Sequence, residues 1–364
     1  MNQPVEADLF CEVVDNLGDI GVMWRLARQM TNEKGWRIRL WVDRLESLTA
    51  IEPAIDHRLP AQTLRNVEVL RWPDPWIAIE PHAVVIAGFS CELPGQYLER
   101  LAQTPDAIWI QLEYLSAEDW VGSFHGLHSQ RNDKLKPVFF FPGFAKDTGG
   151  LIRERDLLKQ RKEWSEQGRS GQWLKSIGVR APSGARLVSV FTYPHAPLHR
   201  LMEQLRLTGE RFHLLVPSRT TYANEQLQER ISVQPIAFLD QAGYDRLLWS
   251  CDLNLVRGED SLVRAIWAAK PLLWQVYPQK DGAHHDKLEA WLKVAVPPPV
   301  VGQVMHEWAD GNLHSDITPS LVSDGWGAWC ESSLSLCKKL AQQTDLATRL
   351  DSWVGAQTVM ADRL

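Results

Sequence analysis

The sequence predicts an α/β protein made of two successive halves with a cleft between them. Apolar segments of strand length alternate with helical segments, as in a doubly wound parallel sheet. The segment at residues 83–89, AVVIAGF, is apolar throughout, which is typical of a central strand buried on both faces. Residues 180–184, RAPSG, have the composition of a linker, and the same alternation starts again after them.

Length and composition agree with this prediction and disfavour several other classes of protein. A chain of 364 residues suits two domains, and 45% hydrophobic with 23% charged residues is typical of a globular protein. No run of about 18 apolar residues is present to span a bilayer, and the N-terminus lacks the basic and apolar parts of a signal peptide. The net charge of −6 disfavours direct nucleic-acid binding. Five cysteines without a CxxC pair suit reduced thiols in a cytoplasmic protein.

The first half is expected at residues 1–180. It begins with a strand at residues 9–14 and a helix at residues 22–30, and it ends with a charged helical segment at residues 151–179. Further strands are expected at residues 37–43, 67–72, 83–89, 107–114 and 137–144.

The second half is expected at residues 185–345. It contains expected strands at residues 187–193, 212–217 and 233–238, with helices at residues 199–207 and 244–250. A helical tail follows at residues 329–354, and a C-terminal helix at about residues 346–364 is expected to pack back on the first half.

Residues 252–279 form the most informative stretch. They predict a strand at 252–256, a polar loop at 257–261 (RGEDS), a helix at 262–269 and a strand at 271–277. A loop that joins the carboxyl end of a parallel strand to a helix is where α/β folds bind phosphorylated ligands. Gly258 permits the sharp turn, Ser261 is the expected N-cap, and the Arg257 guanidinium suits phosphate oxygens.

Two carboxylates in the same loop, Glu259 and Asp260, complicate this interpretation. They would repel a diphosphate unless they point elsewhere, for example towards sugar hydroxyls. The alternative is that RGEDS is only a capped helix start with an acidic first turn.

The loop after the first expected strand, residues 15–21, also contains glycine and two carboxylates, Asp15 and Asp19. Carboxylates on both sides of a tight turn can reach one point above the strand end. There they could act as a general base or hold a guanidinium in a bidentate grip. The alternative is that one of them only caps the helix. Glu113 and Tyr114, which follow the strand at 107–114, are expected beside the same cleft.

Other motifs are weak. His284, His285 and Asp286 are adjacent, and His125 is followed by His128, but neither group has the spacing of a known metal motif. The sequence has no GxGxxG, so a dinucleotide cofactor is not expected, and it has no zinc ligand set, so no metal is expected; it also lacks a Walker loop and a GxSxG elbow.

Four motifs together resemble the bacterial elongation factor P arginine rhamnosyltransferases. These are DNLGDIGVMWRLAR at residues 15–28, FTYP at 191–194, PIAFLDQAGYDRLLWSCD at 235–252 and the stretch at 251–279. The resemblance implies a GT-B glycosyltransferase with two Rossmann-like lobes. It further implies inverting, metal-independent transfer of L-rhamnose from dTDP-β-L-rhamnose to an arginine guanidine of elongation factor P. That modification would activate the factor for rescue of polyproline-stalled ribosomes.

The resemblance also implies roles for individual residues. Asp19 corresponds to the general base, Asp15 to a second essential aspartate, and Glu259 to a residue needed for activity. The acceptor loop comprises Asp15, Asn16 and Asp19. The donor-binding residues implied by the resemblance are Tyr193, Phe238, Gln241, Glu259, Asp260, Ser261 and Tyr277; Arg257 and Gly258 are expected in the same site from the chemistry of the loop. The sequence departs from the family pattern at Leu17, Asp240 and Leu262.

Chemistry makes these roles reasonable. A guanidinium is a poor nucleophile because it stays protonated, with a pKa above about 12. Two carboxylates can therefore both hold the cation and remove its proton as the C–N bond forms. Two alternatives stay open: a GT-B enzyme with another nucleotide sugar or acceptor, and a non-catalytic nucleotide-sugar-binding protein.

Overall fold

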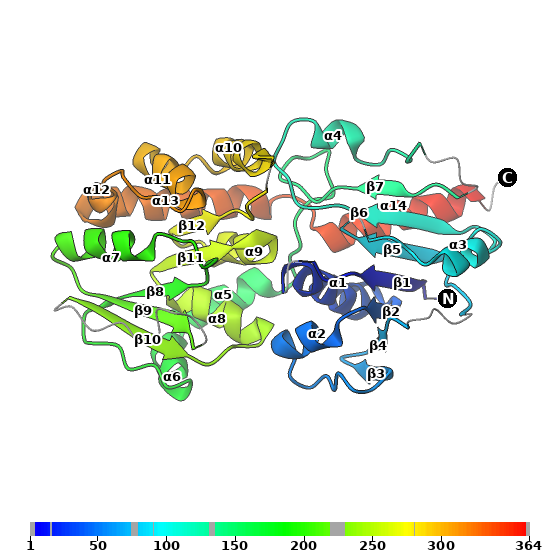
Figure 1. Ribbon diagram of the computed structural model, residues 1–364, viewed down its shortest axis with the longest axis horizontal. Coiled ribbons are helices and arrows are strands. Elements are labelled where there is room, and N and C mark those ends of the chain that lie inside the picture. The colour runs from blue at the N-terminus through cyan, green and yellow to red at the C-terminus, as the bar shows by residue number, and fades with distance from the viewer. Residues whose placement is uncertain are drawn as a thin grey trace. The chain divides into compact units, whose positions relative to one another are not determined.

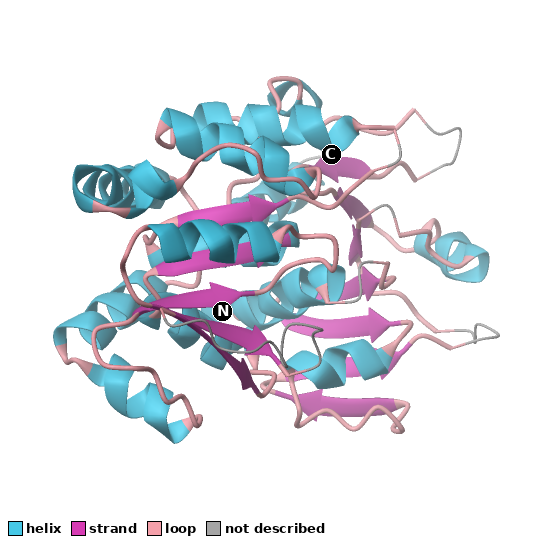
Figure 2. Ribbon diagram, turned by 60° about the vertical axis from the view of Figure 1, so that its left-hand side comes forward, coloured by secondary structure: helices cyan, strands magenta, loops and turns pink. Residues whose placement is uncertain are grey.

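The structure of the protein is a computed structural model, which divides the chain into two compact α/β units (Figure 1). It describes residues 4–14, 17–73, 79–89, 91–130, 135–218, 230–279 and 281–361, with the backbone alone for residues 359–361. Unit 1 comprises residues 1–155 and 343–364, and unit 2 comprises residues 156–342. In both units helices flank the strands (Figure 2). None of the described helices is long and apolar enough to cross a membrane.

Unit 1 is built on a seven-stranded sheet in the order β3-β4-β2-β1-β5-β6-β7. The strands are β1 (Glu6–Cys11), β2 (Arg37–Val42), β3 (Ala61–Leu64), β4 (Val67–Arg71), β5 (Val84–Gly88), β6 (Ile108–Leu112) and β7 (Val138–Phe140). The helices are α1 (Gly18–Lys34), α2 (Leu45–Ile51), α3 (Gly95–Leu101), α4 (Val121–Phe124) and α14 (Leu346–Ala361). All strand pairs of this sheet are parallel except the antiparallel pair of β3 with β4. β3 is a short edge strand that the sequence analysis did not predict.

The centre of this sheet is apolar, as the run at residues 83–89 predicted. Every residue of β5 is buried. On one side Phe10 packs on Trp41 and Tyr97, with ring centroids 5.9 and 4.8 Å apart respectively. The Asp8 carboxylate is buried in this core and accepts hydrogen bonds from Arg39, Trp41 and Tyr97. A buried charge is stable only with partners of this kind.

Unit 2 is built on a five-stranded parallel sheet in the order β10-β9-β8-β11-β12. The strands are β8 (Arg186–Val190), β9 (Phe212–Pro217), β10 (Ile231–Ile236), β11 (Leu253–Arg257) and β12 (Leu272–Gln275). The helices are α5 (Leu157–Glu166), α6 (Arg169–Ser176), α7 (Leu198–Leu207), α8 (Gln241–Ser250), α9 (Gly258–Ala268), α10 (Ala283–Ala295), α11 (Pro299–Ala309), α12 (Thr318–Leu321) and α13 (Ser323–Ala341).

The boundary between the units lies between Arg155 and Asp156, whereas the sequence placed it near residue 180. The charged segment at 151–179 forms α5 and α6, and both helices contact α8 of unit 2. The apolar side of that segment explains its place, because Leu157, Trp164 and Leu174 are buried in unit 2.

The C-terminal helix α14 belongs to unit 1, where it packs on α1. The Trp36 indole donates a hydrogen bond of 2.8 Å to Asp351, and Lys34 donates one of 2.8 Å to Thr348. Leu350 and Val354 are buried. The helical tail is therefore two helices, α13 in unit 2 and α14 in unit 1.

Candidate functional site

The loops at the carboxyl ends of β8, β11 and β12 converge in unit 2. The Arg257 guanidinium lies 4.8 Å from the centroid of the Tyr193 ring, and the Tyr193 and Tyr277 rings meet edge to face at 5.7 Å. Tyr193 is buried, while Tyr277 is 48% exposed. Three of the expected donor-binding residues, distant in sequence, are therefore brought together where parallel α/β sheets bind ligands.

Helix α9 begins at Gly258, four positions earlier than the sequence predicted. Gly258 has φ +63°, a value that favours glycine, and Arg257 before it is extended. Glu259 and Asp260 occupy the first turn, where the helix dipole favours acidic side chains. The prediction of Ser261 as N-cap is therefore wrong. Ser261 lies inside the first turn and is buried, and RGEDS is the helix start itself.

The Arg257 side chain also binds the loop after β8. Its Nη1 donates a 3.2 Å hydrogen bond to the Thr192 carbonyl, and its guanidinium lies 4.5 Å from the Phe191 ring centroid. A guanidinium between two aromatic rings is held by cation–π attraction and packing. Arg257 thus orients the Tyr193 loop and places a positive charge there.

Strand β12 fixes both neighbouring loops, which the sequence analysis missed. The buried Gln275 side chain accepts a 2.7 Å hydrogen bond from the Tyr193 N–H. The Trp274 indole donates a 2.8 Å bond to the Gly258 carbonyl. No local signal marks these residues, because their partners lie 82 and 16 positions away in sequence.

A second residue that the sequence analysis missed is Lys287 on α10. Its ammonium forms an ion pair with the Glu259 carboxylate in the first turn of α9. The two side chains are 19% and 18% exposed, respectively. The carboxylate that was expected to repel a diphosphate therefore has a cationic partner.

Two further expected donor residues lie at the carboxyl end of β10. Phe238 is 48% exposed, and Gln241, the first residue of α8, is buried. Asp240 is the N-cap of α8 and accepts a 2.7 Å hydrogen bond from the Gly243 N–H. An exposed aromatic ring beside a helix start suits stacking against a flat base. The rings of Tyr244 on α8 and Phe191 have centroids 5.7 Å apart. Since Arg257 lies over the same Phe191 ring, this contact connects the region to Arg257.

In unit 1, helix α1 begins at Gly18, again four positions before the predicted start. Asp19 is the second residue of the helix and is only 3% exposed. Its Oδ2 accepts a 2.8 Å hydrogen bond from the Val14 N–H, and Asp43 Oδ1 accepts one of 2.9 Å from the Val13 N–H. Two carboxylates therefore hold the loop after β1. Asp15 and Asn16 lie outside the described residues.

The same edge of this sheet carries Glu113 and Tyr114, directly after β6. Burial raises the pKa of Glu113. The Tyr114 ring stacks on Phe89 with centroids 4.9 Å apart. Since β6 neighbours β5 and β5 neighbours β1, these residues and Asp19 lie at the carboxyl ends of adjoining strands.

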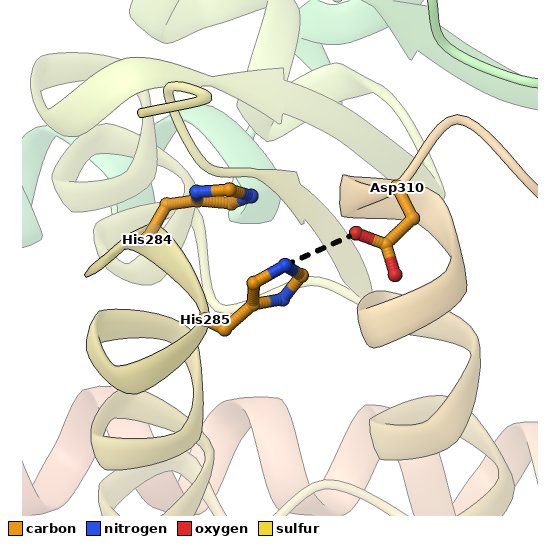
Figure 3. A group of neighbouring side chains, drawn as sticks. All are labelled: His284, His285 and Asp310. Atoms are coloured by element: carbon orange, nitrogen blue, oxygen red, sulfur yellow. Dashed lines mark ion pairs between the residues drawn. The ribbon is translucent and has the colours of Figure 1, made fainter. Parts of the chain in front are cut away.

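One group of side chains, in unit 2, has the composition of a metal site (Figure 3). His284, His285 and Asp310 place ligand atoms within 4.8 Å of one another, with His285 Nε2 3.4 Å from Asp310 Oδ1. His284 Nδ1, however, accepts a 3.2 Å hydrogen bond from the Gln279 N–H. Burial and the charge of His285 lower the pKa of His284. Because Nδ1 accepts this hydrogen bond, the proton of the neutral imidazole lies on Nε2. A ligating nitrogen must be unprotonated, so the group fits a His285–Asp310 pair better than a metal site.

Comparisons with known proteins agree with this geometry. The sequence matches the family described as Elongation-Factor P (EF-P) rhamnosyltransferase EarP over residues 7–355. A protein-arginine rhamnosyltransferase of Pseudomonas putida is 39% identical, over 94% of this chain and 97% of that protein. A protein-arginine rhamnosyltransferase of Pseudomonas aeruginosa is 43% identical, over 79% of this chain and 81% of that protein.

Solved structures give the same result. One described as the structural basis for EarP-mediated arginine glycosylation of translation elongation factor EF-P superposes with a TM-score of 0.62 and 28% identity, covering 96% of this chain and 98% of that one. MurG of Acinetobacter baumannii superposes with a TM-score of 0.54 and 9% identity over 97% of this chain and all of that one, which shows a shared fold only. The chain has the fold of GT-B glycosyltransferases and belongs to the EarP family of elongation factor P rhamnosyltransferases.

Proposed function

We propose that this protein transfers L-rhamnose from dTDP-β-L-rhamnose to an arginine guanidine nitrogen of elongation factor P, with inversion at the anomeric carbon. The observation that carries the proposal is the grouping of Tyr193, Arg257 and Tyr277 at the start of α9, in a chain of this family. The solved relative, described as acting in arginine glycosylation of EF-P, supports the choice of acceptor.

The donor half of the reaction is assigned to unit 2. The N–H groups at the start of α9, with Gly258, Asp260 and Ser261, would bind the diphosphate and sugar. A helix N-terminus favours anions because its first N–H groups have no partner within the helix. Phe238 and Gln241 would contact the thymine base, and Tyr193 and Tyr277 the diphosphate or sugar. Glu259 would accept hydrogen bonds from sugar hydroxyls.

The acceptor half is assigned to the loop after β1. Asp15 and Asn16 would hold the guanidinium, and Asp19 would remove its proton. In the transfer step the bond between the anomeric carbon and the dTDP oxygen breaks as a guanidine nitrogen bonds to that carbon. The nitrogen's proton passes to Asp19, and the bonding electrons leave with dTDP. The Val14 N–H fixes the orientation of the Asp19 carboxylate, which a general base requires.

The leaving diphosphate needs charge stabilisation, which we assign to protein groups rather than to a metal or cofactor. The start of α9, the Ser261 hydroxyl and the Arg257 guanidinium would supply it. The reaction should therefore proceed in EDTA. The acceptor is a translation factor, so the proposed location is the cytoplasm, and the product would be a factor activated for polyproline-stalled ribosomes. Direct contact with nucleic acid or membrane is not part of the proposal.

Intact-mass spectrometry of unmodified elongation factor P tests the proposal directly. After incubation with this protein and dTDP-L-rhamnose, we expect a gain of one deoxyhexose, which fragmentation should assign to an arginine. Controls omit the enzyme or supply another nucleotide sugar. Binding of dTDP-rhamnose without a mass gain would point to another acceptor. If the protein neither binds dTDP-rhamnose nor transfers the sugar, the proposal is contradicted.

A further inference from the structure

The start of α9 poses an electrostatic problem for any nucleoside diphosphate. Glu259 and Asp260 both lie in the first turn, the part of the helix whose N–H groups suit an anion. The Glu259 side chain is only 18% exposed, so water screens its charge poorly. An unpaired carboxylate at this place would oppose the binding that the helix dipole favours.

The neighbouring helix supplies a cation at this point. Lys287 lies on the second turn of α10, which follows β12 and the loop that carries Tyr277. Its ammonium pairs with Glu259 Oε1, and its side chain is 19% exposed. Arg257, another cation among the described residues of this region, is bound to the Thr192 carbonyl and lies over the Phe191 and Tyr193 rings.

We infer that Lys287 is a positioning residue of the donor site: by pairing with Glu259, it cancels the carboxylate charge beside the start of α9 and so permits a diphosphate to bind there. The inference rests on the proposed donor site and assigns a role to a residue outside it. Lys287 acts through Glu259, whose carboxylate the pair also orients towards sugar hydroxyls. The role is electrostatic, so its effect must grow with the charge of the ligand.

A series of ligands that differ only in charge tests this role. Calorimetry would measure binding of thymidine, dTMP and dTDP to the full-length protein and to the K287M variant. We expect K287M to weaken dTDP binding about tenfold, the usual scale for one partly buried charge interaction. The dTMP affinity should fall less, and thymidine binding should not change. K287R, which keeps the charge, should bind dTDP nearly as the wild type does.

A second substitution separates the electrostatic role from a structural one. In K287M the weaker dTDP binding would come from the Glu259 charge that Lys287 no longer balances, so the double variant E259Q/K287M should recover dTDP binding. E259Q alone should bind dTDP at least as well as the wild type. The matched control is K293M on the same helix, since Lys293 is 73% exposed and pairs only at 4.0 Å with Glu289; it should bind all three ligands normally.

Two results would overturn the inference. One is unchanged dTDP binding by K287M; the other is an equal loss for thymidine and dTDP, which would show a structural defect. Failure of the donor proposal would look different. If the wild type binds no thymidine nucleotide but binds another nucleoside diphosphate, the same charge series with that nucleoside tests Lys287. A wild type that binds no nucleoside diphosphate would overturn both.

Discussion

Asp19 and Asp43 make the same contact in the loop after β1, but only Asp19 is assigned a chemical role. Each carboxylate accepts one backbone N–H, from Val14 and Val13 respectively. An asparagine at either position keeps an oxygen that can accept that bond, so the loop should keep its shape. The pair therefore allows the chemical role of one carboxylate to be separated from a shared structural role.

For D19N we expect kcat to fall by about 10²- to 10⁴-fold, the usual contribution of a general base. Binding of dTDP should be unchanged, because the proposed donor residues lie in unit 2. Mass spectrometry gives the transfer rate, and calorimetry gives the affinity. D43N is the matched control and should keep most of the activity. If D43N loses as much activity as D19N, the loop and not the base explains the loss.

Asp8 should make the stability of unit 1 depend on pH. Burial alone would raise the pKa of this carboxyl, but the hydrogen bonds and charge of Arg39, with the Tyr97 hydroxyl and His82 N–H, lower it below its usual value. The unfolded chain has the higher pKa, about 4, so the folded state gains stability from ionised Asp8 at neutral pH. That contribution is lost as the pH falls through the lower, folded pKa.

The expected result is a difference between wild type and D8N in hydrogen exchange of the β1 and β2 amides. At pH 7, D8N should lower their free energy of opening by about 3 kcal/mol or more, because Arg39 loses its buried partner. Between pH 5 and pH 3 the wild type should lose protection more steeply than D8N. Equal pH dependence in the two proteins would contradict the role of Asp8.

At the level of single residues, the sequence analysis predicted several residues of the candidate site but missed those whose partners lie far away in the sequence. The family resemblance placed Tyr193 and Tyr277 in one donor site with Arg257, and the structure brings the three side chains together. Lys287 was missed because its partner Glu259 is 28 positions away, on another helix. Gln275 lies in an apolar strand, where an amide shows no pattern until its partner is known.

Residues 18–21 and 258–261, which the sequence analysis placed in glycine-containing loops, form the first turns of α1 and α9. The sequence placed helix starts at Val22 and Leu262, after the last glycine or polar residue, whereas α1 and α9 begin at Gly18 and Gly258. Glycine has a low propensity for the interior of a helix. At the first position, however, little hydrogen bonding is lost, and the acidic residues beside the glycine interact favourably with the helix dipole. Apolar periodicity detects the packed turns of a helix and not its first turn.

Helices α8 and α9 are joined by a buried ion pair. Arg264 makes hydrogen bonds of 2.8 and 2.7 Å to the two oxygens of Asp245, and the two side chains are 0% and 9% exposed, respectively. Both helices begin with expected donor residues. Removing one partner of such a pair leaves a buried charge without that partner, so the pair should contribute strongly to the packing of α8 on α9.

R264M should therefore lower the free energy of unfolding of unit 2 by about 3–5 kcal/mol. Urea denaturation followed by circular dichroism measures it. The control is R200M, which removes an exposed pair with Glu203 and should cost less than about 1 kcal/mol. A cost for R264M as small as that for R200M would show that Asp245 is stabilised by other groups.

On the scale of the whole molecule, the chain leaves unit 1 at residue 155 and returns to it at residue 343. The returning segment is an integral part of unit 1. Arg349 donates to the Lys146 carbonyl at 2.7 Å, and the Leu346 N–H donates to the Leu151 carbonyl at 2.9 Å. The sequence analysis expected the C-terminal helix to pack back on the first half, and residues 343–364 do belong to unit 1.

Truncation after Gln342 tests this organisation. Unit 1 would lose α14, and the hydrophobic contacts of Leu350 and Val354 with the rest of the unit would be lost. We expect its amides to lose hydrogen-exchange protection, β1 and β2 included, whereas unit 2 keeps its protection and its affinity for dTDP. The truncated protein should therefore bind donor without transferring sugar. Normal protection of β1 in the truncated chain would show that unit 1 folds without α14, and loss of dTDP binding would show that unit 2 depends on it as well.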